Sequence, residues 1–298
     1  MPKLMGQTRA ILVAALTTLV VLGGPATALG NSYRVIYNFK GSADGWGPMG
    51  VPAVAKNGDL YGVTNGGGTH DYGTVFKVTA PQGRGGTWKK TVLYNFTSGD
   101  AEILTSLVMA KDGTLYGAGY NDQNNPGFIF QLKPPVGGDG SDGDWQYDVL
   151  YTFSNDSGGI FVDGIALDAK GDIYGTTEAG GDLSCPAGYG LGCGVVFELK
   201  RPTQQGGQWV FSLLYAFGQG GNDDAVEPFA GVTLGPKGTL YGSTHGGGAY
   251  GYGAAYRLSS PRQKGGTWTE AVLYSFEPGT NMGCLLYTSD AADDLTRV

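Results

Sequence analysis

The chain has 298 residues, a formal net charge of −7 and only 15% charged residues, and no basic cluster stands out. These features argue against a nucleic acid partner. Glycine is abundant, at 55 residues, but aromatic residues make up 12% and recur at fixed places, which a disordered linker does not require. The composition therefore predicts a folded, soluble protein.

Residues 1–28 have the pattern of a secretory signal peptide. Lys3 and Arg9 give a basic start, Ala10–Leu22 is an apolar run, and Ala26-Thr27-Ala28 is a small-x-small cleavage site. The alternative is a membrane anchor, but the run is shorter than the ~20 residues that a span needs. We expect export, a location outside the cell or on its surface, and no transmembrane segment in the mature chain.

Three short phrases repeat along the rest of the sequence. The first joins a Trp to a Leu-Tyr-x-Phe phrase six residues later, and its Trp, Tyr and Phe are Trp88, Tyr94, Phe96, Trp145, Tyr151, Phe153, Trp209, Tyr215, Phe217, Trp268, Tyr274 and Phe276. The second is Leu/Ile-Tyr-Gly, with its tyrosines at Tyr61, Tyr116, Tyr174 and Tyr241. The third is an apolar-aromatic phrase centred on Phe76, Phe130, Phe197 and Tyr256.

Hydrophobic residues alternate with polar ones inside each unit, which is typical of β-strands. The first unit offers strands at about Val51–Ala55, Asp59–Thr64, Thr74–Thr79 and Trp88–Phe96, with a Lys56-Asn57-Gly58 turn between the first two. Four antiparallel strands in each of four units predict an all-β fold of β-propeller blades, with units at about residues 40–96, 97–153, 154–217 and 218–276. A β-solenoid or a chain of sandwiches is the alternative, although solenoid coils are shorter than these units.

Together the phrases resemble the GloVer repeats of choice-of-anchor tandem-repeat proteins, from about Tyr33 to Phe276. The second unit departs from the pattern at residues 121–125, and the third carries a cysteine-bracketed insert. The resemblance implies an exported protein, often with a C-terminal surface anchor, and it brings no catalytic residues.

The two ends of the repeat array predict an incomplete ring. From Cys284 onward the sequence breaks the repeat and resembles a translated sequencing adaptor, so residues 284–298 are expected to be non-native. A natural acidic tail is the alternative. Tyr33–Phe39 supplies a fifth copy of the Leu-Tyr-x-Phe type of strand without its blade. We expect it to help close the ring of the intact protein, and we expect the 29–283 array to be an open arc with exposed blade faces.

Without Cys284, two cysteines remain, Cys185 and Cys193, on either side of a short glycine-rich insert. An exported protein and a short flexible loop favour a structural disulfide between them. Two thiols without a nearby His favour a metal site much less.

Acidic residues follow the Tyr-x-Phe strands, at Asp44, Asp100, Asp156, Asp223 and Asp224. They could form Ca²⁺ sites, but each loop supplies few of the six to eight oxygen ligands that Ca²⁺ needs. Turn-forming Asp residues are the simpler interpretation, so no cofactor is expected. His70 and His245 lie in similar glycine-rich loops and could share a metal only if those loops met.

Carboxylates outside the repeat pattern are Glu102, Asp163, Glu178 and Glu227. A pair of them could act as general acid and base on a glycoside. The leading hypothesis is a non-catalytic secreted or surface protein that binds a protein or glycan through its loops. A propeller-fold carbohydrate-active enzyme and a purely structural envelope protein are the alternatives, and paired, partly buried carboxylates would favour the enzyme.

Overall fold

A computed structural model describes residues 35–278, apart from residues 84, 99, 101–102, 121–126, 136–144, 155–158, 186–190, 205, 222 and 264. The expected signal peptide, the adaptor-like tail, Glu102 and Asp156 therefore lie outside the described residues. The described residues from Tyr37 onward belong to one compact unit. Within the described ranges, no helix has the length and apolar character needed to cross a membrane.

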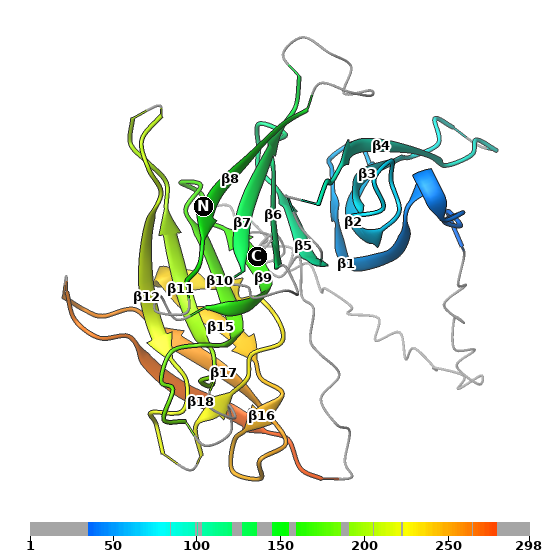
Figure 1. Ribbon diagram of the computed structural model, residues 1–298. Helices are drawn as coiled ribbons and strands as arrows, with labels where there is room; N and C mark the ends of the chain where they lie inside the picture. Colours follow the sequence, from blue (N-terminus) through cyan, green and yellow to red (C-terminus); the bar gives the residue numbers. More distant parts are fainter. Residues whose placement is uncertain are drawn as a thin grey trace, which may run out of the picture. The chain divides into compact units, whose positions relative to one another are not determined.

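The described chain is almost entirely β-structure, arranged in four successive four-stranded antiparallel sheets (Figure 1). The strands of the first two sheets are β1 (Trp46–Val54), β2 (Leu60–Gly66), β3 (Thr74–Thr79), β4 (Lys89–Asn95), β5 (Ile103–Met109), β6 (Leu115–Tyr120), β7 (Phe128–Lys133) and β8 (Gln146–Thr152). Those of the last two are β9 (Ile160–Leu167), β10 (Ile173–Ala179), β11 (Val195–Lys200), β12 (Val210–Ala216), β14 (Thr233–Leu234), β15 (Leu240–Ser243), β17 (Ala254–Ser259) and β18 (Thr269–Ser275).

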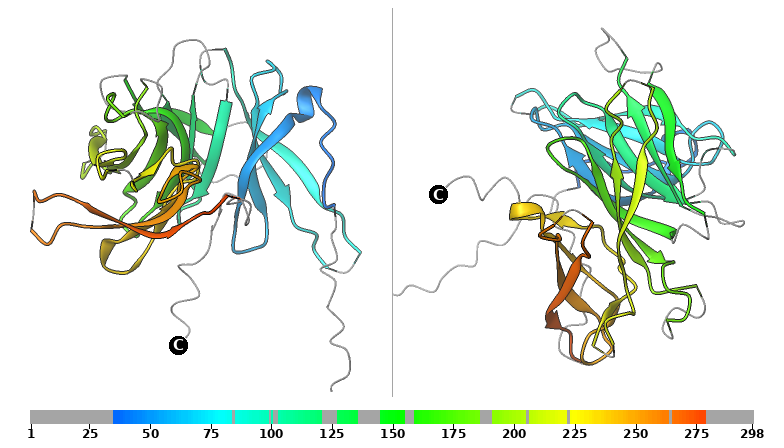
Figure 2. Two further views of the ribbon diagram at one scale, coloured as in Figure 1. Left: turned by 90° about the horizontal axis from the view of Figure 1, so that it is seen from below. Right: turned by 90° about the vertical axis from the view of Figure 1, so that its left-hand side faces the viewer.

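Each sheet is a meander whose strands pair in chain order, as in β1-β2-β3-β4. The turn after the first strand of the first sheet ends on Gly58, whose φ of +85° favours glycine, and Gly113 and Gly171 repeat this conformation. A small additional pair, β13 (Ala225–Val226) with β16 (Gly246–Gly247), joins the loops of the last unit. Successive twisted four-stranded sheets of this kind are β-propeller blades, which confirms the predicted fold class (Figure 2).

Aromatic side chains hold neighbouring sheets together through one contact that repeats along the chain. The Phe of each Tyr-x-Phe phrase packs edge-on against the third-strand aromatic of the next sheet, with ring centroids 5.0–5.6 Å apart. These pairs are Phe96 with Phe130, Phe153 with Phe197, and Phe217 with Tyr256. Because Phe96, Phe153 and Phe217 are at most 1% exposed, the main core lies between sheets.

The Gly of each Leu/Ile-Tyr-Gly phrase leaves room for this aromatic contact. A Cβ atom built on Gly175 would lie 2.5 Å from the ring of Phe197 and 2.8 Å from the Gly164 carbonyl oxygen. Gly62 and Gly117 lie equally close to the corresponding rings of their own sheets. The phrase therefore needs glycine because an aromatic ring lies directly on the backbone.

The expected strict alternation along the fourth strand is wrong at one residue in every sheet. In the first sheet Val75 pairs with Tyr94 and Phe76 pairs with Val92, so Leu93 is an additional, bulged residue. The corresponding shift occurs in the other three sheets. A bulge reverses which face the following residues use. As a result, Phe211 packs on Tyr151 of the preceding sheet, whereas Phe217 in the same segment faces the next sheet.

Residues 35–40 form no strand, although a strand was expected at Tyr33–Phe39. Phe39 nevertheless packs edge-on against Phe76, with centroids 5.1 Å apart, and Tyr37 packs against Phe39. These are the contacts that a Tyr-x-Phe phrase makes with the following sheet elsewhere in the chain. At the other end, Leu273 and Tyr274 of β18 are 53% and 56% exposed, and no following sheet covers them among the described residues.

Candidate functional site

Asp163 is the most unusual of the candidate carboxylates. It lies on β9 between Gly164, which pairs with Thr176, and Val162, which pairs with Thr177, so it is the additional residue of a β-bulge. Its Oδ2 is buried and has no hydrogen-bond partner. Burial, with a smaller contribution from Glu178, raises the pKa of Asp163 to about 8. The carboxyl group is therefore largely protonated at neutral pH.

The second sheet has an equivalent bulge, and its additional residue is Thr105. Asp163 in the third sheet therefore stands where the second sheet has a threonine. Thr105 donates its hydroxyl to the Val162 carbonyl oxygen at 2.6 Å and so joins β5 to β9. A threonine satisfies this interface with one hydrogen bond, whereas Asp163 leaves a buried oxygen without a donor. The carboxyl group thus carries an energetic cost that the repeat does not require.

Glu178 and Glu227 belong to the same electrostatic group as Asp163. Burial and the charge of Glu227 raise the pKa of Glu178, while His245 acts in the opposite direction. His245 Nδ1 lies 3.4 Å from Glu227 Oε2, and its ring packs 5.2 Å from that of Phe229. Electrostatic interactions therefore link Asp163, Glu178 and Glu227 and add His245, whereas Glu102 lies outside the described residues.

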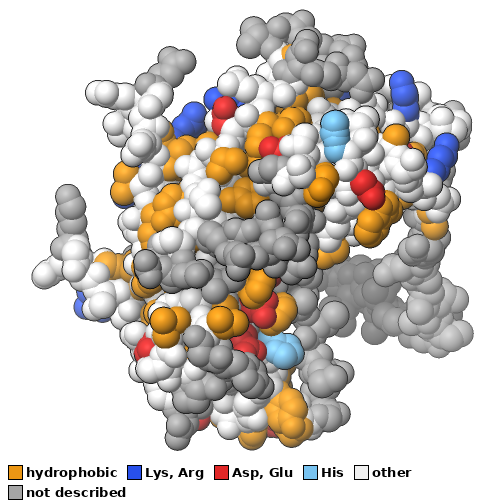
Figure 3. Space-filling model, viewed as in Figure 1, with side chains coloured by type: hydrophobic (Ala, Val, Ile, Leu, Met, Phe, Trp, Pro, Cys, Tyr) orange, Lys and Arg blue, Asp and Glu red, His pale blue; other side chains and the backbone are white. Residues whose placement is uncertain are grey.

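The other histidine takes no part in this group. Figure 3 shows His side chains at two separate places on the face that it draws. Within the described ranges, no cluster of three or more His, Cys, Asp or Glu side chains is arranged to hold a metal ion.

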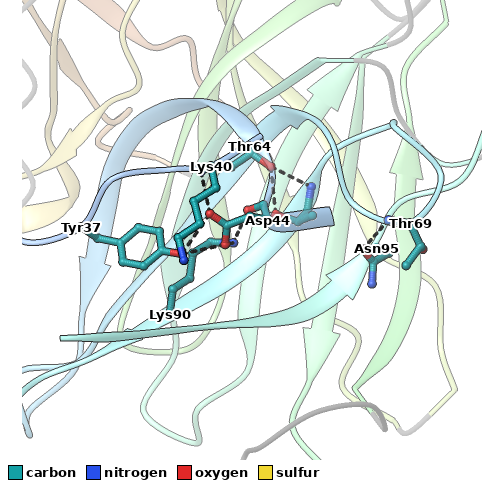
Figure 4. A network of polar contacts seen from close by, with 8 residues as sticks. Tyr37, Lys40, Asp44, Thr64, Thr69, Lys90 and Asn95 are labelled. Carbon is teal, nitrogen blue, oxygen red and sulfur yellow. Dashed lines mark hydrogen bonds and ion pairs between the residues drawn. The ribbon is translucent and has the colours of Figure 1, made fainter. Parts of the chain in front are cut away.

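The Asp residues after the Tyr-x-Phe phrases hold turns. Asp44 accepts hydrogen bonds from the Tyr37 hydroxyl at 2.7 Å and the Lys40 amide at 2.8 Å, and it forms an ion pair with Lys90 at 3.3 Å (Figure 4). Burial disfavours its charge, but these donors together lower the pKa of Asp44. Asp100 likewise accepts from the Thr97 amide and the Tyr94 hydroxyl.

Asp224 repeats this arrangement in the last unit and is almost completely buried. It accepts hydrogen bonds from the Tyr215 hydroxyl at 3.1 Å and from the amides of Gly218 and Gly220 at 2.6 and 2.8 Å. The neighbouring Asp223 is exposed. Protein N–H and O–H groups thus donate hydrogen bonds to the carboxylates of these turns, as is typical of turn-forming Asp residues.

Cys185 and Cys193 are joined by a disulfide, with their Cα atoms 5.9 Å apart. Both are buried, and Cys193 is linked to the group around His245, because its carbonyl oxygen accepts from the Glu227 amide at 2.9 Å. Glu227 itself has a φ of +57°, a conformation that costs energy for a residue other than glycine. The disulfide loop thus helps to position Glu227, the strained member of the cluster formed by Asp163, Glu178 and Glu227.

The segment at residues 181–183, just before the disulfide loop, borders a groove of about 700 Å³. Its walls come from the loop at residues 181–183, from β12, and from the turn before β18. Its principal side chains are Asp182, Leu183, Leu213, Tyr215, Gln219 and Trp268. Leu183 and Leu213 are 61% and 46% exposed.

The predicted repeat-core residues differ in burial according to their place in the blade. Tyr116, Trp145, Phe96, Phe153 and Phe217 are buried. The half-buried members are Tyr61, Tyr174, Tyr241, Trp88, Trp209, Trp268 and Phe276. The half-buried Tyr174 donates its hydroxyl to Glu198 at 2.8 Å, which shows that some of these rings have a polar end outside the core.

Sequence reasoning did not identify the groove, although the unit that borders it was recognised as irregular. The insert at Cys185–Cys193 was interpreted only as a longer loop. A second overlooked signal is the residue two positions after each repeat Trp, which is Lys90, Tyr147, Phe211 or Glu270. That position contacts the preceding Tyr-x-Phe phrase, so its variation changes the chemistry of each interface.

One family model and several solved structures are similar to this chain. No curated protein matches the sequence. One of the similar solved structures is the PQQ-bound aldose sugar dehydrogenase from Streptomyces coelicolor, with 19% identity and a TM-score of 0.43. The similarity covers 74% of this chain but only 63% of that enzyme. The model of the Gloeobacter/Verrucomicrobia repeat matches residues 25–187, which is more than half of the sequence and agrees with the resemblance seen in its motifs. The chain therefore belongs to the Gloeobacter/Verrucomicrobia repeat family.

Proposed function

We propose that this protein is a secreted or surface-anchored, non-catalytic repeat protein that binds a glycan in the groove beside its disulfide loop. The groove is the observation that carries the proposal. It combines the aromatic rings of Tyr215 and Trp268 with the carboxylate of Asp182 and the amide of Gln219. Aromatic faces pack on the apolar faces of sugar rings, while carboxylate and amide groups bond to sugar hydroxyls.

The electrostatics of the groove favour binding over catalysis. Asp182 is the carboxylate of the described lining, and the Ser184 hydroxyl and amide lower its pKa, so it is ionised at neutral pH. A single ionised carboxylate can accept hydrogen bonds but cannot supply the acid and base pair that glycoside hydrolysis uses. The disulfide supports an oxidising, extracellular location.

Binding can be tested by screening the purified protein on a glycan array and measuring positive glycans by calorimetry. Trp268→Ala should weaken binding at least tenfold, because it removes the largest ring of the groove. Trp88→Ala is the matched control, since Trp88 holds the same repeat position in the first sheet. Equal glycan affinities for wild type and Trp268→Ala would refute the groove as the binding site. If the protein bound other proteins but no glycan, the ligand of the groove would be a protein and not a glycan.

The second candidate is a carbohydrate-active enzyme that uses the group around Asp163. One observation favours it: Asp163, with a pKa of about 8, retains its proton at neutral pH, as a general acid must, and Glu178 lies close enough to influence it. If this candidate is correct, the protein should hydrolyse one of the oligosaccharides on an array, and Asp163→Asn should abolish turnover without changing groove binding. Absence of hydrolysis across the array would remove this candidate.

A further inference from the structure

The contact between the third and fourth sheets differs chemically from the equivalent contact at the first sheet. In the first sheet Lys90, two residues after the repeat Trp, pairs with Asp44 at 3.3 Å. At the same repeat position in the fourth sheet stands Glu270, whose carboxyl group interacts with that of Asp224, the counterpart of Asp44. An attractive pair of opposite charges is thus replaced by two carboxyl groups.

Two donors, the Ala225 amide and the Tyr215 hydroxyl, favour the charged form of Glu270, but burial and Asp224 outweigh them. The groups that face it are Asp224 and Tyr215 from the side of the third sheet, Tyr256 from β17, and the Ala225 amide. Glu270 Oε1 is buried without a donor, and the fully buried Tyr256 hydroxyl also has no partner. Arg257 follows Tyr256 in β17, so strand alternation directs its side chain to the opposite face of the sheet.

Two buried carboxyl groups in contact disfavour a second negative charge. Burial and the neighbouring Asp224 raise the pKa of Glu270 from its usual 4.5 to about 8. The folded protein therefore holds a proton that the unfolded chain releases at lower pH, so the stability from this contact is complete below about pH 4.5 and is lost as pH rises through about 8.

We propose that the contact of Glu270 with Asp224 is a proton-operated joint between the third and fourth sheets, closed at neutral and acidic pH and loosened in mildly alkaline solution. Tyr215, which bonds to Asp224, and Trp268, two residues before Glu270, both line the groove. Opening the joint should therefore distort the groove walls. Control of ligand affinity in this way rests on the proposed function, whereas the joint itself does not.

The joint is tested without ligand on the full chain by thermal unfolding between pH 4 and 9. Glu270→Gln keeps the shape of a protonated glutamate but cannot ionise. It should match wild type at pH 4 and exceed its Tm by at least ~2–4 °C at pH 9. Asp223→Asn, which removes an exposed carboxylate next to Asp224, is the control and should follow wild type. Parallel Tm profiles for Glu270→Gln and wild type would overturn the proposal.

Hydrogen exchange locates the effect and provides a second readout. From pH 7 to 9 the wild-type segments β12 and β18 should lose at least threefold in protection relative to β4 and β8, after correction for intrinsic rates. Glu270→Lys places an ammonium group opposite Asp224, as Lys90 does opposite Asp44, and should abolish this loss. Uniform loss of protection in all four strands would contradict a local joint. A local pH response in a protein that binds no glycan would support the joint and refute only the proposed function.

Discussion

Replacing Phe153 by alanine should destabilise the protein far more than the same change at Phe276. Both residues end a Tyr-x-Phe phrase, but Phe153 is 1% exposed and contacts the rings of Tyr151, Phe197 and Phe211 at 5.0, 5.0 and 5.7 Å. Phe276 is only half-buried, and Tyr274 is its aromatic neighbour among the described residues.

The expected magnitude follows from buried area. A buried aromatic side chain removes roughly 150–250 Å² from water, and at about 25 cal/mol per Å² this stabilises the fold by about 4–6 kcal/mol. Alanine retains a small part of this contribution, so Phe153→Ala should cost about 3–5 kcal/mol. Phe276→Ala loses a partly hydrated ring with one aromatic neighbour and should cost about 1–2 kcal/mol.

Urea unfolding followed by circular dichroism measures both variants against wild type. An unchanged slope with a lower midpoint would show that stability alone has changed. If the two variants lost equal stability, the contact between successive sheets would not be the main source of core stability. If Phe153→Ala cost less than about 1 kcal/mol, the packing of Phe153 against the third sheet would be wrong.

Three further outcomes test individual features of the fold. Gly175→Ala should cost about 1–3 kcal/mol, because its Cβ would collide with the ring of Phe197, and an unchanged urea midpoint would contradict that close approach. Replacing Cys185 and Cys193 by serine should cost about 2–3 kcal/mol by freeing a short loop in the unfolded chain, provided that the wild-type sample is oxidised. Carboxyl NMR should show one Asp titrating near pH 8, well above the usual value, and this signal should disappear in Asp163→Asn; normal titration of every Asp would refute the buried site.

The sequence was sufficient to predict the repeat, its strand content and the blade fold. The reason is physical: Trp88 to Phe96 and its copies place aromatic residues at strand spacing, and one blade cannot bury such rows alone. Turn glycines such as Gly58 could also be predicted from the sequence, because a tight turn favours a residue that tolerates positive φ. These are local properties, and local patterns specify them.

Only the tertiary structure decided which neighbour each residue contacts. A one-residue bulge at Leu93 and its counterparts reverses the face of the strand, so alternation alone placed Phe211 and Phe217 on one face when they contact different sheets. The same holds for the candidate sites. Asp163, Glu178 and Glu227 come from separate segments, as do Asp224 and Glu270, and their meeting depends on how two sheets pack. Spacing along the chain does not contain that information, because the protonation of each group depends on burial and on charges that only packing brings close.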